Sequence, residues 1–181
     1  MLVLVDMDGV IADFHRGFVD EWQKRHPQKP YVPLEMVTDF YLKNVYPKED
    51  HSLVDALYRL PNFYRSLPEI PGAKESVGDI ARRHDVFICT TPVLPEHKHC
   101  VEEKYAWVED HYGAEWLGRL ILTKDKTVVR GRFLIDDKPE IKGVAKPEWE
   151  QVLYDQPYNR NVQGKRRMTW ANWRDVLREL A

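Results

Sequence analysis

The sequence has little of what marks secreted, membrane-spanning or nucleic-acid-binding proteins. It contains two cysteines in 181 residues, which is too few for a disulfide framework and favours a reducing compartment. No apolar run approaches the length of a membrane span, and no secretory leader precedes the first apolar run. The formal net charge is -2, so no strong field attracts nucleic acid or an anionic membrane. We therefore expect a cytoplasmic protein without a membrane or nucleic-acid polymer as partner.

Three local patterns have plain structural interpretations. The basic stretch Gly164-Lys165-Arg166-Arg167 has no aromatic platform around it and is interpreted as a solvated loop. The acids Glu102, Glu103, Glu109 and Asp110 are interpreted as the solvated face of a helix. His97, His99 and Cys100 resemble half of a zinc site, but no second half exists, so a helix surface is preferred.

Short, mostly continuous apolar runs predict parallel strands that are covered on both faces. These runs are Leu2–Asp6, Val86–Thr90, Leu120–Thr123, Arg132–Asp136 and Gln151–Asp155. Helical patterns are found at Ala73–Arg83, Glu96–Tyr112 and Trp170–Leu180, with Thr169 as the expected N-cap of the last. This alternation predicts an α/β fold with a three-layer, Rossmann-like parallel sheet and right-handed crossovers.

The interval between the first two strands is too long for one crossover. Residues 15–70 are helical in character, rich in aromatic residues and punctuated by prolines. We expect them to form a small helical cap subdomain inserted over the sheet. Residues 1–14 and 71–181 would then form the core domain.

Polar residues follow successive predicted strands. Asp6 and Asp8 follow the first, Thr90 and Thr91 the second, Lys124 and Lys126 the third, and Asp136 and Asp137 the fourth. Because ligands of open α/β sheets bind beyond the carboxyl ends of the strands, these residues should share one edge. Several carboxylates at one point need a hard cation, and oxygen ligands favour Mg²⁺. A hydroxyl and an ammonium beside that metal would suit a phosphate.

Each of these motifs also has a purely structural alternative. An Asp-x-Asp-Gly segment is often a turn, a Thr pair often caps a helix, and lysines usually lie on the surface. These alternatives do not explain why all four motifs fall at successive strand ends. We therefore favour a site in which an aspartate attacks phosphorus and a second aspartate acts as general acid.

These residues carry a resemblance to a known family. The motifs of the haloacid-dehalogenase-like phosphatases are similar to Asp6-Met7-Asp8-Gly9-Val10, Ile88-Cys89-Thr90-Thr91-Pro92, Lys126 and Ile135-Asp136-Asp137. The segments VDMDGVIADF, FICTTP, EKYAWVEDH, LTKDKTVV and FLIDDK resemble, more narrowly, the cytosolic and mitochondrial 5'(3')-deoxyribonucleotidases. The resemblance runs from residue 1 to about 155 and is weakest in the middle of the cap and after Tyr158.

The resemblance implies a role for each matching residue. Asp6 would be the nucleophile and a metal ligand. Asp8 would be the general acid and base, and its backbone carbonyl would contact the metal and its side chain the substrate. Asp136 and Asp137 would complete the Mg²⁺ site, with Asp137 as the more direct ligand. Thr90 and Lys126 would hold the phosphate, with Thr91 nearby.

The resemblance also implies a nucleoside pocket. Its lining would be Phe14, Phe40, Tyr41, Leu42 and Tyr58. Lys124 stands where the family tends to have arginine, and lysine cannot make a forked contact with substrate. The implied activity is Mg²⁺-dependent hydrolysis of nucleoside monophosphates, with pyrimidine deoxyribonucleotides such as dUMP and dTMP preferred. A sister phosphatase of another small metabolite and a non-catalytic nucleotide sensor are the alternatives. A homodimer is compatible with the sequence.

Overall fold

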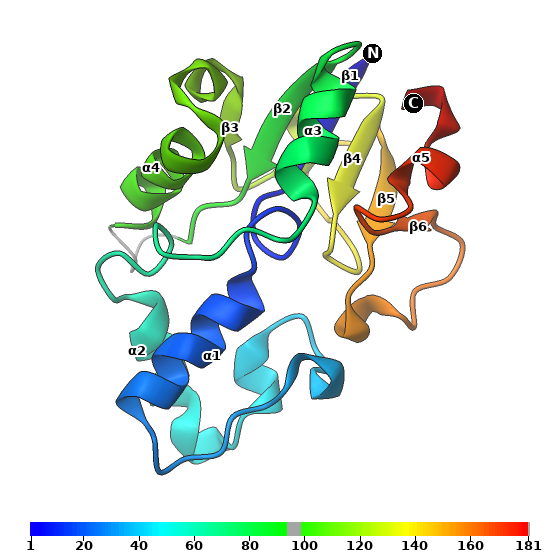
Figure 1. Cartoon of the computed structure of the whole chain (residues 1–181). Helices are drawn as coiled ribbons and strands as arrows, with labels where there is room; N and C mark the ends of the chain where they lie inside the picture. The colour runs from blue at the N-terminus through cyan, green and yellow to red at the C-terminus, as the bar shows by residue number, and fades with distance from the viewer. Residues whose placement is uncertain (94–98, 181) are drawn as a thin grey trace.

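The chain forms an α/β fold around one parallel sheet, as a computed structural model covering all 181 residues shows (Figure 1). Residues 1–93 and 99–180 are described below. The strands are β1 (Leu2–Val5), β2 (Asp85–Thr90), β3 (Leu120–Leu122), β4 (Phe133–Asp136), β5 (Glu150–Tyr154) and β6 (Arg167–Met168). They form a six-stranded sheet in the order β3-β2-β1-β4-β5-β6, and every neighbouring pair is parallel.

The helices are α1 (Phe14–Arg25), α2 (His51–Tyr58), α3 (Ala73–Ala81), α4 (Cys100–Tyr112) and α5 (Trp173–Val176). Helices α3, α4 and α5 pack on one face of this sheet, and α1 and α2 lie beyond its carboxyl end. Short 3₁₀ turns are η1 (Leu34–Met36), η2 (Leu42–Val45), η3 (Lys48–Asp50), η4 (Ala114–Arg119), η5 (Lys126–Val128), η6 (Pro157–Asn159) and η7 (Arg178–Leu180). Within the described residues, no helix combines the length and apolar character that crossing a membrane requires.

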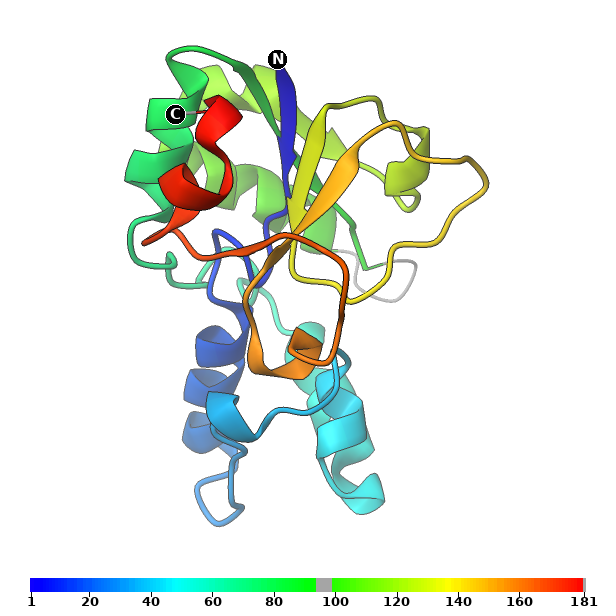
Figure 2. The same cartoon turned by 90° about the vertical axis from the view of Figure 1, so that its right-hand side faces the viewer.

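The central strand β1 buries both of its faces, as its continuous apolar sequence predicts. Val3 and Val5 belong to the larger hydrophobic cluster, whereas Leu4 belongs to a second cluster with Leu134 and Trp149. This alternation is the two-residue period of a strand whose faces are both covered. Figure 2 shows α3 and α5 on one side of the sheet. The segments that carry Val129, Ile141 and Trp149 cover the other face. The predicted α/β fold with a parallel sheet covered on both faces is therefore confirmed.

The segment between β1 and α3 lies beyond the carboxyl end of the sheet (Figures 1 and 2). Helix α1 begins after Asp13, whose side chain accepts a hydrogen bond from the Arg16 backbone N–H at 3.0 Å. Its buried residues Phe18 and Trp22 pack against Tyr46. This aromatic cluster is continuous with the larger core, so the segment rests on the sheet domain rather than apart from it. The boundaries at residues 15 and 70 remain predictions.

The prediction of one terminal helix over Trp170–Leu180 is wrong. The chain forms only the short α5 and the turn η7, separated by Leu177 with a φ of -117°. Asn172, rather than Thr169, precedes the helix, and the Thr169 backbone N–H donates to the Asn172 side chain at 2.8 Å. Tertiary packing explains the late start of α5, because Trp170 is buried and its Nε1 donates to the Val10 carbonyl at 2.7 Å.

The basic stretch at residues 164–167 is likewise not a solvated loop. Arg167 begins β6, a strand that the sequence reading missed. Arg166 forms ion pairs with Glu150 at 2.6 Å and Glu179 at 2.8 Å, and Arg167 pairs with Asp155 at 2.9 Å. These residues are only partly exposed, because acids on β5 and at the C-terminal end lie where the arginines can reach them.

Candidate active site

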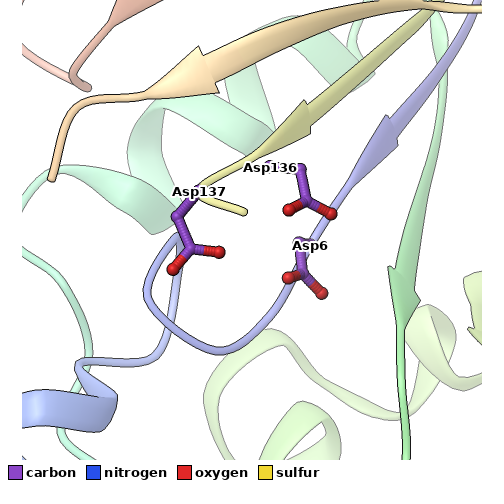
Figure 3. A group of neighbouring side chains, drawn as sticks. All are labelled: Asp6, Asp136 and Asp137. Atoms are coloured by element: carbon purple, nitrogen blue, oxygen red, sulfur yellow. The ribbon is translucent and has the colours of Figure 1, made fainter. Parts of the chain in front are cut away.

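Three aspartates converge where β1 and β4 end. Asp6 follows β1 and its backbone N–H donates to the Ile135 carbonyl of β4 at 2.9 Å. Asp136 ends β4, and Asp137 comes next. One carboxylate oxygen from each of Asp6, Asp136 and Asp137 lies within 4.8 Å of the others. Figure 3 shows the three carboxylates turned toward a common space. The structure thus brings together three of the predicted metal ligands, and Asp8 lies on the loop that follows Asp6.

The chemistry of these carboxylates fits a divalent cation. One oxygen each of Asp8 and Asp137 is buried and accepts no hydrogen bond among the described residues. Burial, Asp136 and Asp6 raise the pKa of Asp137 well above its usual range. Burial also raises the pKa of Asp136 to about 6, although Lys126 opposes the shift. Negative charges that are crowded away from water need a cation, and oxygen-only ligands suit Mg²⁺.

Lys126 lies among the same carboxylates. Its Nζ is 2.7 Å from Asp6 Oδ1 and 2.6 Å from Asp136 Oδ2, and the residue is buried. The Asp125 carboxylate orders the turn that carries it, accepting hydrogen bonds from the Thr127 and Val144 backbone N–H groups, both at 2.8 Å. The predicted phosphate-binding lysine is therefore held beside the predicted nucleophile.

A second buried lysine was missed by the sequence interpretation. Lys104 of α4 is completely buried, and its Nζ donates to Asp8 Oδ2 at 2.5 Å and to Thr90 Oγ at 3.0 Å. It thereby connects the predicted general acid with the predicted phosphate-binding hydroxyl. The α4 sequence held a signal, because Lys104 stands in register with the apolar residues Cys100 and Trp107 on one face of the helix.

Glu103, next to Lys104, is also buried, so its assignment to a solvated helix face is wrong. Its carboxylate accepts hydrogen bonds from the backbone N–H groups of Asn62 at 2.5 Å and Tyr64 at 3.0 Å. Asn62 has a φ of +68°, a left-handed conformation that asparagine tolerates better than most residues. The acid therefore fastens the returning end of the inserted segment to α4.

The other predicted residues near the phosphate lie in different surroundings. Thr91 directly follows the buried Thr90 at the end of β2 and is partly exposed. Lys124 is exposed, and its Nζ donates to the Pro92 carbonyl at 3.1 Å. Cys100 is buried in α4 rather than on its surface, and His99 immediately precedes that helix. His97 and the predicted start of the helix at Glu96 lie outside the described residues.

The residues predicted to contact the nucleoside separate into two groups. Phe40 and Tyr41 line a cavity of about 580 Å³, together with Lys138 and Tyr158 from the loops that follow β4 and β5. Phe14 and Tyr58 instead pack against each other, with ring centroids 5.5 Å apart, and do not line that cavity. Leu42 is buried in the core.

Tyr158 contacts both the acid cluster and the cavity, and the sequence interpretation missed it. Its hydroxyl donates to Asp137 Oδ2, and its ring meets Phe40 edge-on with centroids 5.9 Å apart. Its position was the signal, since residues 156–158 follow the fifth predicted strand at the same sheet edge as the other motifs.

The whole chain matches one protein family. The sequence model of the family described as "5' nucleotidase, deoxy (Pyrimidine), cytosolic type C protein" matches residues 1–180. A Bordetella pertussis protein assigned as a 5'(3')-deoxyribonucleotidase is 47% identical over 178 residues, 98% of this chain and 95% of that protein. The cytosolic 5'(3')-deoxyribonucleotidase of Homo sapiens is 43% identical over 186 residues, 97% of this chain and 92% of that protein.

Solved structures share the fold at low sequence identity. A haloacid-dehalogenase-like hydrolase of Deinococcus radiodurans, solved with phosphate and sodium, matches with a TM-score of 0.62 at 16% identity, over 99% of this chain and 95% of that one. A Bacillus subtilis hydrolase of this type, solved with magnesium, matches with a TM-score of 0.59 at 13% identity, over 97% of each chain. The fold, the sequence motifs and the close relatives agree: this chain belongs to the 5'(3')-deoxyribonucleotidase family of haloacid-dehalogenase-like phosphatases and is a phosphoric monoester hydrolase.

Proposed function

We propose that this chain is a Mg²⁺-dependent nucleotidase that hydrolyses pyrimidine deoxyribonucleoside monophosphates, dUMP and dTMP, through an aspartyl-phosphate on Asp6. The observation that carries the proposal is the convergence of Asp6, Asp136 and Asp137 beside the buried Lys126. Such a site can neutralise phosphate oxygens while one carboxylate attacks phosphorus. The family relatives support a nucleotide as substrate.

Asp6, Asp136, Asp137 and the Asp8 backbone carbonyl would hold the cation. The cation would neutralise charge on the phosphate oxygens. Asp6 attacks phosphorus and forms the acyl phosphate, while Asp8 gives its proton to the leaving sugar oxygen. Asp8 then takes a proton from the water that hydrolyses the acyl phosphate. Lys126 and Thr90 hold the phosphoryl oxygens throughout.

The environment of Asp8 suits this exchange of a proton. Burial raises the pKa of Asp8, and Lys104 opposes that rise. Lys104 engages only Oδ2, so Oδ1 can carry the proton that passes to the leaving group and can then accept one from water. The Asp8 side chain is one quarter exposed, which leaves it open to the substrate side.

Aromatic residues support the choice of a nucleoside. Phe40 and Tyr41 line the cavity beside the acid cluster, and their faces can stack a base. Stacking does not select among bases, but the bulk of this aromatic segment favours a single-ring base. A 2'-hydroxyl that meets an apolar wall loses water without gaining a partner, and such pockets reject an added hydroxyl by up to ~10²-fold.

Steady-state kinetics on dUMP, UMP and dAMP test the substrate. We expect kcat/KM to be highest for dUMP and about ten- to a hundredfold lower for UMP. Hydrolysis of 3'-phosphates is also expected, because the residues that bind the phosphate, Thr90 and Lys126, are separate from those that line the base pocket. Equal kcat/KM for the three nucleotides would contradict nucleoside recognition by this segment.

Substitution of the two aspartates tests the mechanism. Asp6→Asn should abolish measurable turnover in a folded protein, since it removes the attacking charge. Asp8→Asn should cost about 10²–10⁴ in rate on dUMP and less on p-nitrophenyl phosphate, whose leaving group needs no proton. A tenth of wild-type activity in Asp6→Asn, or equal losses on both substrates in Asp8→Asn, would rule out these roles.

A further inference from the structure

The turn after β5 encloses Asp137. Asn159 is completely buried, and its Nδ2 donates to the backbone carbonyls of Asp137 at 2.7 Å and Tyr154 at 2.8 Å. Arg167 of β6 donates in turn to the Asn159 carbonyl at 2.9 Å. Gln156 connects the same turn to the loop after β1, because its Nε2 donates to the Gly9 carbonyl at 2.8 Å. The backbone of Asp137 is therefore fixed by residues distant in sequence.

The Asp137 side chain is held at one oxygen and left free at the other. The Tyr158 hydroxyl donates to Oδ2, whereas Oδ1 is buried and accepts no hydrogen bond among the described residues. Gly9, at a φ of +76°, leaves room for this pair, because a Cβ there would collide with Asp137 Oδ2 and crowd the Tyr158 hydroxyl. Both features indicate that one particular rotation of the Asp137 carboxylate is selected.

We propose that Tyr158 is a positioning residue for the divalent cation, holding Asp137 Oδ2 so that Oδ1 faces the cation together with an oxygen of Asp6. This inference rests on the proposed Mg²⁺ dependence. A carboxylate without such a partner can rotate about its last bond, and cation binding must then fix it. Groups that orient metal ligands typically account for 10- to 100-fold in metal affinity.

The ring of Tyr158 packs separately from its hydroxyl, so the two contributions can be tested apart. Its ring packs against Phe40, and η6 contacts η1 of the inserted segment. Phenylalanine at this position retains the ring and this packing while removing only the hydroxyl. Tyr158→Phe therefore separates the hydrogen bond to Asp137 from the packing of the segment that lines the cavity.

Isothermal titration of the metal-free protein with MgCl₂ tests the inference, with Mn²⁺ and its paramagnetic resonance as a second probe. We expect Tyr158→Phe to bind both ions 10- to 100-fold more weakly than the wild type. Tyr105→Phe is the matched control, because Tyr105 lies on the exposed face of α4. In the presence of EDTA the unfolding free energy of Tyr158→Phe should stay close to that of the wild type.

Kinetics at varied Mg²⁺ add a signature that a purely structural role would not give. Saturating Mg²⁺ should restore most of kcat in Tyr158→Phe, with KM for dUMP within about twofold of wild type. Equal metal affinities for wild type and Tyr158→Phe would overturn this inference and leave the proposed function intact. Failure of the wild type to bind Mg²⁺ or Mn²⁺ would overturn both.

Discussion

Lys104 is a single buried charge that contacts both the proposed general acid Asp8 and the proposed phosphate-binding residue Thr90. Removing one partner of a buried ion pair leaves the other without compensation. Lys104→Met would leave Asp8 Oδ2 and Thr90 Oγ without their shared donor. The proton of Asp8 would then be held more tightly and its carboxylate less well aimed.

We expect Lys104→Met to lower kcat/KM on dUMP by about 10²–10⁴, the range of a general acid. Steady-state phosphate release, on protein shown to be folded by circular dichroism, measures the loss. Lys74→Met is the matched control, since Lys74 is an exposed lysine of α3. Retention of a tenth of wild-type activity would show that Lys104 is not needed for the reaction.

The same lysine shows where residue-by-residue inference from the sequence succeeded and failed. Asp6, Lys126, Asp136 and Asp137 could be predicted to lie together because each follows a strand, and parallel strands end at one edge. Lys104 comes from the first half of a helix, and lysine is ordinarily an exposed residue. Only its helical register with Cys100 and Trp107 marked it as buried.

Helix α4 links two parts of the molecule through adjacent residues. Glu103 accepts the backbone N–H groups of Asn62 and Tyr64, and Lys104 lies with its Nζ 5.4 Å from the centre of the Tyr64 ring. The inserted segment is thereby attached to the element that also supports Asp8.

Glu103→Gln tests this attachment. An amide offers only one acceptor oxygen, so one of the two backbone N–H groups would face an NH₂ group. Loss of a buried hydrogen-bond acceptor costs about 1–3 kcal/mol. We expect a decrease of that size in the unfolding free energy, measured by urea titration, whereas the exposed neighbour variant Glu102→Gln should change it little. Equal effects of the two substitutions would contradict the attachment.

At the level of elements, local patterns predicted the strands better than the end of the chain. β1, β2, β4 and β5 are mostly continuous apolar runs, and no boundary differs from the prediction by more than one residue. The two-residue strand β6 has no such pattern and depends on its register beside Leu153 and Tyr154. The terminal helix is short because Trp170 and Trp173 are buried against the core, which overrides helical periodicity.

For the whole molecule, acid sensitivity follows from His15 in α1. Its Nε2 lies 3.0 Å from the Val32 carbonyl and so carries the proton of a neutral ring. Burial lowers the pKa of His15 below its usual value of about 6.5, although Asp13 and Glu35 oppose the shift. The unfolded chain therefore binds a proton at His15 more readily than the folded one. The free energy of unfolding consequently decreases as the pH falls through about 6.5 and below.

We expect the unfolding free energy to fall between pH 7 and pH 5 more steeply in the wild type than in His15→Gln. Above pH 7 the contribution of the neutral ring is fully present, so the two proteins should differ there by a constant amount. Urea titrations at closely spaced pH values measure both curves. Parallel curves throughout would show that His15 does not couple the inserted segment to protonation.

The path of the chain has a consequence for its biosynthesis. Asp6 and Asp8, which we propose attack phosphorus and transfer the proton, are synthesised before the residues that enclose them. Strand β1 pairs with β4, and the loop after β1 is closed by Gln156 and by the Trp170 indole on Val10. Such long-range contacts form late and slowly. A nascent chain therefore carries these two carboxylates without a site around them until β4, Gln156 and Trp170 have emerged, and phosphatase activity begins only then.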